Sequence, residues 1–458
     1  MSAARQFLRS SGVMVLLYAG STGLSFLSGV LLARMLGADG FGAYALALTT
    51  ATLVGMMTEF GLPTLLLREA SAARANNEWG QVRGLLSWSN RAILVLSFVL
   101  ITGTWAGHAL FAANRSSEYL ATLLWSVLLI PFVAFGKLRS NVLLALDHVA
   151  GSQVPVMILR PALFLSACAA LYFANDHLAP AGAMAAQVFG AAGAMMVIFA
   201  LYRKNRPDAL RSSKPIKEVG KWLATALPMG MTEGLRLLQG QLGLLLVGAM
   251  AGTLQAGLYR VADAVAMVTA VFVSVAGTAA TPMFGRLWRG GDREGLQRVA
   301  LLCAMGMTVG TFLLGLPIAL AGHVIIPMVF GDQFSRSADV FLVLWLGTTL
   351  ACSLGHALSL ANMTGRHVLA TQSFAVIALV NAAIGATVIP RSGAVGAAFA
   401  TSCGMIAGTL YCTVRLWRED RINTTIYTRR SLVLWNLAIS RSMAIVSRGD
   451  RGNATKLR

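Results

Sequence analysis

The chain has 458 residues, of which 56% are hydrophobic and only 12% are charged, and its mean hydropathy is +0.68. These values exclude a soluble globular domain of ordinary composition. The formal net charge is +19, but no basic patch interleaved with aromatic residues lies in a soluble segment, which argues against nucleic acid as a partner.

Hydrophobic residues form blocks long enough to cross a hydrocarbon core about 30 Å thick, where backbone groups are satisfied only within helices or closed barrels. No alternating strand pattern is present, so we predict an all-α membrane protein with about twelve transmembrane helices. The first span is too long for a cleavable signal peptide and is expected to be retained. The expected spans are 12–36, 41–63, 84–112, 119–136, 152–174, 180–202, 222–250, 256–283, 299–319, 338–361, 368–389 and 393–416.

The spans fall into two sets of six that share phrases in the same order. Residues 30–44 align without gaps on residues 245–259, and both copies end in Gly-x-Tyr (Gly42/Tyr44 and Gly257/Tyr259). Near the end of each set, residues 181–186 (AGAMAA) return as 392–397 (SGAVGA). Six spans restore the starting side of the membrane, so we predict two parallel six-helix repeats, a plan typical of transporters whose halves rock about a central site.

The distribution of Lys and Arg predicts the orientation. Connections on the side of the N-terminus carry 19 basic residues, whereas the opposite connections and the span ends beside them carry five. Since basic residues are retained on the cytoplasmic side, both termini are expected in the cytoplasm of a multi-pass inner-membrane protein. These basic residues also explain the net charge, because they meet anionic membrane lipids at the inner face.

The expected domains follow from the spans and the basic connection between the two sets. They are an N-terminal six-helix lobe (1–202), a basic cytoplasmic linker (203–221), a C-terminal six-helix lobe (222–418) and a basic cytoplasmic tail (419–458). The tail holds an apolar stretch, Leu432 to Val446, that is short for a crossing. It is predicted either to lie on the inner leaflet as an amphipathic helix or to form an irregular tail.

Neither a metal site nor a cofactor site is predicted. All five cysteines lie in or at the end of apolar spans without a CxxC pair, so we interpret them as small packing residues. The six histidines are dispersed and form no catalytic constellation, and no Walker phosphate-binding loop is present. These observations argue against a membrane-embedded enzyme of glycan assembly, such as a polymerase or an acyltransferase.

Ionisable residues inside the spans are the candidate functional residues, because each costs roughly 2.5–3.5 kcal/mol on insertion scales. Several have a local explanation: Glu233 and Arg236 are three residues apart, as are Arg260 and Asp263, so each pair can neutralise itself. Arg34 and Arg91 lie near span ends and can extend to headgroups. Arg160 and Glu59 have no opposite charge at helical spacing.

Most of these charges fall in spans one, two, seven and eight, which are equivalent helices of the two copies. We therefore expect a wet cavity between the halves, with Arg34, Arg160, Arg236 and Arg260 as substrate-binding residues. Arginine stays protonated and forks to phosphate oxygens, so an anionic substrate that carries phosphate is favoured over a lipophilic cation. The acids Glu59, Glu233 and Asp263 are candidates for coupling transport to a proton or to Na⁺.

The phrases at residues 31–37 (LLARMLG) and 40–44 (GFGAY) resemble the polysaccharide-export branch of the multidrug/oligosaccharidyl-lipid/polysaccharide exporter superfamily. Residues 59–63 (EFGLP), 67–69 (LRE) and 393–398 (GAVGAA) are similar to later family phrases. The resemblance covers about residues 8–418 and implies a Wzx-type flippase, a V-shaped bundle of two six-helix lobes with a cationic central cavity. Arg34 is the site residue that matches the motif itself.

The function implied by the resemblance is alternating-access transfer of undecaprenyl-pyrophosphate-linked oligosaccharide from the inner to the outer leaflet. Such transport serves O-antigen, capsule or exopolysaccharide synthesis. The implied partners are this lipid-linked oligosaccharide, membrane lipids, and the polysaccharide polymerase with its chain-length machinery. The main alternative is a MATE-like antiporter of drugs or other cations, for which a more acidic and aromatic cavity is expected.

Overall fold

The computed structural model describes residues 3–76, 78–111, 117–216 and 218–427, and every regular element in these ranges is a helix. Up to residue 216 the helices are α1 (Ala3–Glu59), α2 (Leu62–Asn76), α3 (Trp79–Phe111), α4 (Ser117–Ala145), α5 (Val149–Val154), the π-turn η2 (Pro155–Leu159), α6 (Arg160–Asn175), α7 (Pro180–Asn205) and α8 (Asp208–Ser212). From residue 218 onward they are α9 (Val219–Thr269), α10 (Val271–Arg289), α11 (Arg293–Phe330), the 3₁₀ turn η3 (Asp332–Phe334), α12 (Ser337–Ser353), α13 (Ala357–Met363) and α14 (His367–Asp420). The predicted all-α class is confirmed.

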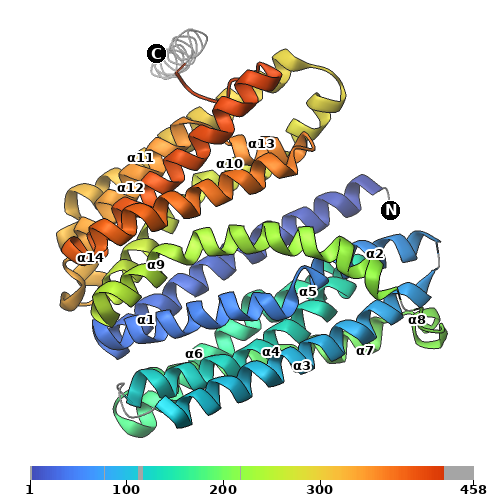
Figure 1. The fold of residues 1–458 in the computed structure, drawn as a ribbon, viewed down its shortest axis with the longest axis horizontal. Helices are drawn as coiled ribbons and strands as arrows, with labels where there is room; N and C mark the ends of the chain where they lie inside the picture. The colour runs from blue at the N-terminus through green and yellow to red at the C-terminus, as the bar shows by residue number, and fades with distance from the viewer. Residues whose placement is uncertain (1–2, 77, 112–116, 217, 428–458) are drawn as a thin grey trace, which may run out of the picture. The chain divides into compact units, whose positions relative to one another are not determined.

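Eight described helices are long and apolar enough to cross a membrane, and the bent pair α12–α13 forms a ninth candidate. Three of the eight, α1, α9 and α14, contain an internal glycine with a non-helical backbone. α14 holds two expected spans, α1 holds one and most of the next, and α9 holds one and the first part of the next. Figure 1 shows that α1 doubles back along the bundle. Divided at these three glycines, and with the bent pair included, the described helices supply the twelve expected spans.

The duplication is visible in the backbone itself. Gly37 in α1 has φ 69° and ψ −179°, and Gly252 in α9 has φ 88° and ψ 177°. These two glycines occupy equivalent positions of the aligned phrases 30–44 and 245–259. A residue with a Cβ atom rarely adopts this positive φ, so glycine is required at the point where each copy turns back.

Two expected spans are less regular than the hydropathy pattern indicates. Expected span 152–174 begins with α5 and passes through η2, where the Arg160 N–H donates to the Pro155 carbonyl five residues earlier. Pro161 follows directly and supplies no N–H of its own, so the α-helical ladder is interrupted here. Expected span 256–283 is divided between α9 and α10 at Ala270 (φ −81°, ψ 7°), a break that no local proline or glycine explains.

The chain forms two compact units that do not coincide with the two sequence copies. Unit 1 holds the chain up to Val265 together with 321–342 and 381–400, whereas unit 2 holds 266–320, 343–380 and the chain from Thr401 onward. Unit 1 thus contains the whole first copy and the first helices of the second. The lobes 1–202 and 222–418 and the linker 203–221 remain predictions from the sequence.

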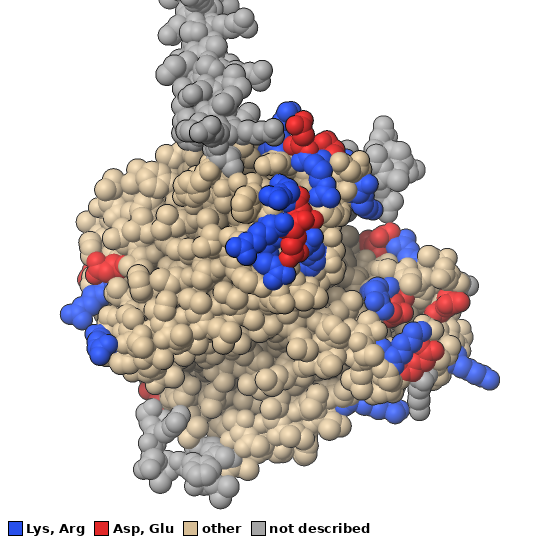
Figure 2. Space-filling view, turned by 45° about the horizontal axis from the view of Figure 1, so that its top comes forward, with Lys and Arg blue, Asp and Glu red and all other residues tan. Residues whose placement is uncertain are grey.

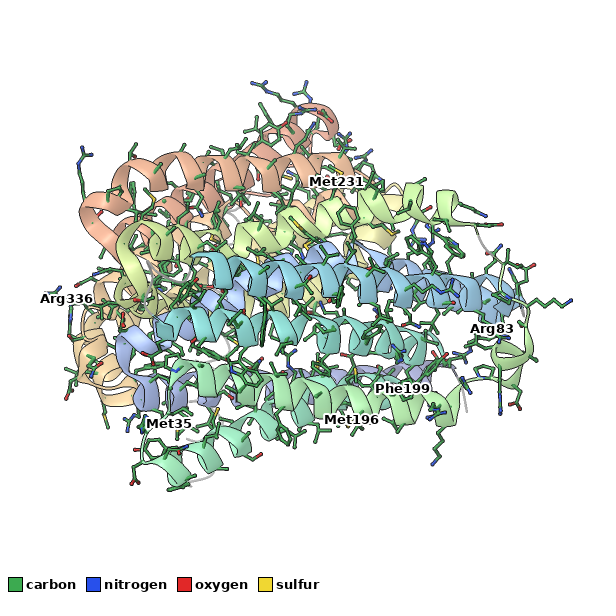
Figure 3. All side chains as sticks on the ribbon, turned by 60° about the horizontal axis from the view of Figure 1, so that its bottom comes forward. Met35, Arg83, Met196, Phe199, Met231 and Arg336 are labelled. Carbon is green, nitrogen blue, oxygen red and sulfur yellow. The ribbon has the colours of Figure 1, made fainter. Side chains whose placement is uncertain are left out.

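Unit 1 has two ends that orient its description. Met35 and Arg336 lie at one end, called the kink end here because Gly37 and Gly252 turn the chain nearby, and Arg83 lies at the other (Figure 3). The opposite end is called the linker end, since Arg83 Nη1 donates to the carbonyls of Arg211 (2.7 Å) and Ser213 (2.5 Å) in the connection between the copies. Buried residues of α2, α3, α4 and α7 form the main core cluster of unit 1, Leu65, Leu85, Leu138 and Ile198 among them.

Unit 2 packs its own core from α10, α11, α13 and α14, with Phe284 and Leu360 fully buried. Arg366, in the turn between α13 and α14, pairs with Glu419 and with Asp420 (2.8 Å). These ion pairs join that turn to the C-terminal end of α14. The first residues of the expected tail also pack in this unit, because the Ile426 N–H donates to the Ser353 carbonyl (3.0 Å). The apolar stretch Leu432 to Val446 lies outside the described residues.

Apolar side chains cover much of the described surface, as a lipid-facing protein requires. Phe173 is 81% exposed and Met196 is 65% exposed. On the face shown in Figure 2, charged side chains gather in separate groups and wide areas carry none. In water such a surface would favour aggregation, whereas in a bilayer it is the normal exterior of a helical bundle.

Candidate functional site

The duplicated phrases contact each other within unit 1, close to the kink glycines. A Cβ atom built on Gly42 would lie 1.8 Å from the Thr253 carbonyl oxygen, and one built on Gly257 would lie 2.0 Å from the Ala38 carbonyl oxygen. Gly42 and Gly257 are equivalent positions of the repeat, and so are Ala38 and Thr253. The contact is therefore reciprocal, as expected for two copies related by an approximate twofold axis, and only glycine permits it.

Beyond this crossing, the second half of α1 runs antiparallel to the first half of α9. Leu46 fits against Gly248, the Thr49 hydroxyl donates to Gln241 Oε1 (3.3 Å), and Met56 fits against Gly234. Small residues on α9 allow the backbones to approach closely, which is how helices associate without a hydrophobic driving force in lipid. This seam holds the first helix pairs of the two copies together.

Tyr44 lies beside the crossing and near two of the predicted arginines. Its side chain is buried (6% exposed) and its ring stacks on Phe164 of α6 at 6.2 Å between centroids. The Tyr44 hydroxyl is within electrostatic range of both Arg160 and Arg260. Tyr44 thus places the cations of α6 and α9 on one side of α1, in what we call the Tyr44 cluster (Tyr44, Arg160, Arg260 and Asp263).

Arg160 begins α6 directly after the π-turn η2. Its Nε atom is buried and has no hydrogen-bond partner among the described residues. The backbone here is closely packed, since a Cβ atom on Gly190 of α7 would lie 2.8 Å from the Arg160 carbonyl oxygen. Among the described residues no carboxylate contacts this arginine. Arg160 is therefore suited to bind the anion of a ligand.

Arg260 and Asp263 form an ion pair across one turn of α9, with Nη1 and Oδ2 3.0 Å apart. Their side chains are 35% and 31% exposed, so both are partly accessible in the described structure. The pair neutralises itself at rest and leaves Arg260 donors free for a second anion.

The Glu233–Arg236 pair lies at a different level along α9 from the Tyr44 cluster. Tyr44 and Arg260 lie seven and eight residues beyond their kink glycines, which places both about 10–12 Å along their helices at 1.5 Å per residue. Arg236 lies 16 residues from Gly252, or about 24 Å from the kink. Its partner Glu233 (2.5 Å) and Arg236 itself are both exposed, near the middle of the first half of α9.

Glu59 ends α1 near the linker end and is paired with a residue that sequence spacing did not indicate. Lys137 Nζ of α4 lies 2.8 Å from Glu59 Oε2, and the Glu59 side chain is only 12% exposed. The next turn is closed by Gly61, where a Cβ atom would lie 2.6 Å from the Ala226 carbonyl oxygen of α9. Glu59 therefore joins the end of α1 to α4, two residues before the close approach of Gly61 to α9.

Arg34 lies at the kink end and is engaged with backbone rather than with the cluster. Its Nε donates to the Val329 carbonyl (2.7 Å) and its Nη2 to the Met328 carbonyl, both in the last turn of α11. A cation on the free carbonyls of a helix C-terminus complements the helix dipole. Nearby, Gln333 Oε1 accepts from the Ala38 N–H (3.0 Å), which caps the helix that begins after Gly37.

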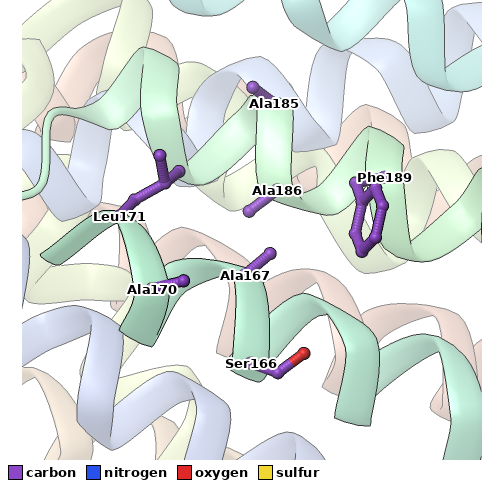
Figure 4. A pocket seen from close by; sticks show the side chains of 7 residues that line it. All are labelled: Ser166, Ala167, Ala170, Leu171, Ala185, Ala186 and Phe189. Carbon is purple, nitrogen blue, oxygen red and sulfur yellow. The ribbon is translucent and has the colours of Figure 1, made fainter. Parts of the chain in front are cut away.

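A groove of the described surface lies elsewhere (Figure 4). It has a volume of about 480 Å³ and is formed by α6 and α7. Its lining is apolar apart from the Ser166 hydroxyl, and none of the predicted charged residues contributes to it. The lining residues are Ser166, Ala167, Ala170, Leu171, Ala185, Ala186 and Phe189.

The structure thus brings Arg160, Arg260 and Asp263 together around Tyr44. Glu233 with Arg236, Glu59 and Arg34 lie at three other levels of unit 1. Tyr44 and Lys137 were not predicted as functional residues. Tyr44 was nevertheless marked by the duplicated Gly-x-Tyr ending, whereas Lys137 could be found only from the packing of α4 against α1. No group of three metal-ligating side chains occurs in the described part of the chain.

Two solved structures share this fold. A multidrug resistance MATE family transporter of the MOP superfamily, in an inward-facing conformation, has a TM-score of 0.72 at 14% identity, with 88% of this chain and 94% of that chain covered. The lipid II flippase MurJ, in an inward closed conformation, has a TM-score of 0.65 at 13% identity, with 88% and 87% covered. At these identities the likeness establishes the fold.

The long apolar helices and the fold shared with these two structures define a polytopic helical membrane protein. Residues 7–288 match the family model described as "Polysaccharide biosynthesis protein", and the chain belongs to this family. It is also 25% identical over 222 residues to "Stage V sporulation protein B" of Bacillus subtilis (strain 168). That alignment covers 46% of this chain and 41% of that protein, so the chain matches about two fifths of the length of this curated relative.

Proposed function

We propose that the protein flips an undecaprenyl-pyrophosphate-linked oligosaccharide from the inner to the outer leaflet of the bacterial cytoplasmic membrane by alternating access. The proposal is supported by family membership and by the fold shared with a lipid II flippase. The observation that carries it is the Tyr44 cluster, where two arginines from different helices lie within electrostatic range of one tyrosine and only one acid, Asp263, is paired with them. A net positive cluster within a bilayer favours an anionic head group.

In this mechanism Arg160 and Arg260 bind the pyrophosphate oxygens and replace the hydration that the phosphates lose on leaving the headgroup region. Arg160 supplies a donor that has no protein acceptor, and Arg260 exchanges part of its contact with Asp263 for the substrate. Tyr44 lies between the two cations and positions the head group by its hydroxyl. The polyprenyl chain stays in the surrounding lipid, because its transfer into water is unfavourable.

The exposed pair Glu233–Arg236 and the residues Arg34 and Glu59 line the proposed route rather than its centre. Arg236 meets the head group nearer the linker end, and Arg34 receives it at the kink end when its bonds to α11 open. Asp263, Glu233 and Glu59 each sit beside a cation. Displacement of that cation by the substrate would free the acid for a proton or for Na⁺, which is how ion coupling would arise.

A MATE-like antiporter of organic cations is the second candidate, because the fold of a MATE transporter matches over 88% of this chain. The Tyr44 cluster argues against it. A cationic substrate would meet two arginines and only one acid there, and like charges repel strongly where the dielectric is low.

Polysaccharide export by cells that depend on this chain tests the proposal. Arg160→Gln and Arg260→Gln are expected to reduce export at least about ten-fold, the effect of losing a charge-assisted hydrogen bond to phosphate. Arg391→Gln is the matched control, because Arg391 is an exposed arginine in α14 outside the cluster. Full export by both cluster variants at normal membrane levels, or drug efflux without a polysaccharide defect in deletion cells, would contradict the proposal.

A further inference from the structure

We propose a second anion site, at the linker end of unit 1, where Arg139 and Arg203 bind the phosphate of an anionic membrane lipid. The site is formed by α4 and α7 and is separate from the Tyr44 cluster. Its existence rests on neither the transported substrate nor the direction of transport.

Two arginines share one aromatic ring at this site. Arg139 Cζ lies 5.1 Å from the centroid of Phe199, and Arg203 Cζ lies 5.3 Å from the same centroid. Arg139 also contacts the Phe135 ring at 5.4 Å. The two guanidinium groups are therefore neighbours, at most the sum of these two ring distances apart. Attraction to the ring holds each cation in place.

These cations have no counter-charge among the residues that the structure describes. Arg139, Arg203 and Arg206 take part in none of the ion pairs formed by the described residues. Arg139 Nη1 donates to the Phe135 carbonyl (3.0 Å), whereas its buried Nε has no acceptor. Like charges gathered without an acid repel one another, so an added anion stabilises the group.

A further set of contacts fixes the wall of the site. The buried Tyr202 hydroxyl hydrogen-bonds Arg206 and is within electrostatic range of Arg139 and Arg83. Arg83 is held by the linker carbonyls, as described above, and a Cβ atom on Gly84 would lie 1.8 Å from the Ile216 carbonyl oxygen. The linker thus packs on α3 and closes one side, while Arg203 stays exposed on the other.

The neighbouring surface indicates a lipid rather than a soluble phosphate. Phe189, Met196 and Phe199 of α7 are 57%, 65% and 39% exposed, and their spacing places them on one helix face that ends at Arg203. Figure 3 shows Met196 and Phe199 along α7 toward the end where Arg83 lies. A ligand that fits has an anionic head at the arginines and an apolar chain along this face, as basic pockets between transmembrane helices bind anionic lipids.

The test uses the purified full-length protein in a neutral detergent. Lipid binding is counted by native mass spectrometry, and the apparent melting temperature is recorded, during titration with phosphatidylglycerol, phosphatidylcholine or inorganic pyrophosphate. The variant is Arg203→Gln and its matched control is Lys204→Gln, the next residue on α7, which is equally basic and exposed but contacts no ring. Arg139→Gln is a second variant that probes the buried partner.

Phosphatidylglycerol is expected to bind wild-type protein and the Lys204→Gln variant alike, and to bind Arg203→Gln and Arg139→Gln about ten-fold more weakly, the effect of losing a charge-assisted hydrogen bond. Equal binding of phosphatidylcholine, or equal weakening by Lys204→Gln and Arg203→Gln, would overturn the proposal in favour of an unspecific basic surface. Stabilisation by pyrophosphate that is as strong as that by phosphatidylglycerol, and that is lost in Arg203→Gln, would overturn the lipid as the source of the phosphate at this site. Should Arg139→Gln fail to fold, the exposed Arg203 still decides the result.

Discussion

Gly42 and Gly257 show how single residues encode the contact between the two copies. Gly42 lies against the Thr253 carbonyl, and Gly257 lies against the Ala38 carbonyl, which is the equivalent carbonyl of the first copy. Overpacking a close contact typically costs about 1–3 kcal/mol, because backbones must separate. A methyl group at either position therefore acts on the crossing that also positions Tyr44.

Gly42→Ala and Gly257→Ala are each expected to lower the apparent melting temperature of the purified protein by several degrees and to reduce export. The matched control is Gly29→Ala on α1, where an added Cβ atom would meet nothing within 4 Å. Because both substitutions open the same crossing, the double variant should lose less stability than the two single losses combined. Unchanged melting of both single variants would refute the close contact.

The partner of a charged residue could be predicted where it lies one helical turn away in the sequence. It could not be predicted where tertiary packing supplies it. The i,i+3 pairs Glu233–Arg236 and Arg260–Asp263 occur as expected. Glu59 seemed unpaired in sequence, but Lys137 reaches it from α4. Arg34 seemed free for substrate, but backbone carbonyls of α11, nearly 300 positions away in the chain, accept its hydrogen bonds. Such partners leave no periodic signal.

Helices and spans are the scale at which the sequence was most informative. Hydropathy alone predicts twelve spans, because a hydrocarbon core demands about 20 apolar residues in each. It does not show that two spans form one kinked helix at Gly37 or Gly252, since the turn needs a single glycine and no polar loop. The π-turn before Arg160 was marked by Pro155 and Pro161, whereas the break at Ala270 has no local signal.

The proposed orientation predicts which connections are accessible from outside the cell. Cysteine introduced at Asp176, in the connection after α6, should react with a membrane-impermeant thiol reagent added to intact cells. Cysteine at Ser212, in the linker, should react only after the membrane is opened; both positions are exposed. The native cysteines of the wild-type protein give the background, and four of these five are buried. Labelling of Ser212→Cys but not of Asp176→Cys in intact cells would reverse the orientation.

At the scale of the whole molecule, the two copies supply a common frame and their differences supply the chemistry. Gly37, Gly42 and Tyr44 have counterparts in Gly252, Gly257 and Tyr259, whereas Arg34 corresponds to Ala249. Arg160 and the Arg260–Asp263 pair then make the Tyr44 side of the crossing cationic. An asymmetric site at a symmetric crossing is suited to one anionic head group presented to either side in turn.

The most direct test is transfer of the lipid itself across a bilayer. Purified protein is reconstituted in vesicles that contain a fluorescent undecaprenyl-pyrophosphate-linked oligosaccharide, and the fraction quenched from outside is followed over time. We predict that the wild-type protein makes the inner-leaflet pool accessible, that Arg391→Gln does the same, and that the double variant Arg160→Gln/Arg260→Gln leaves this pool protected. Failure of the wild-type protein to expose the inner pool, or equal transfer by the double variant, would contradict the account.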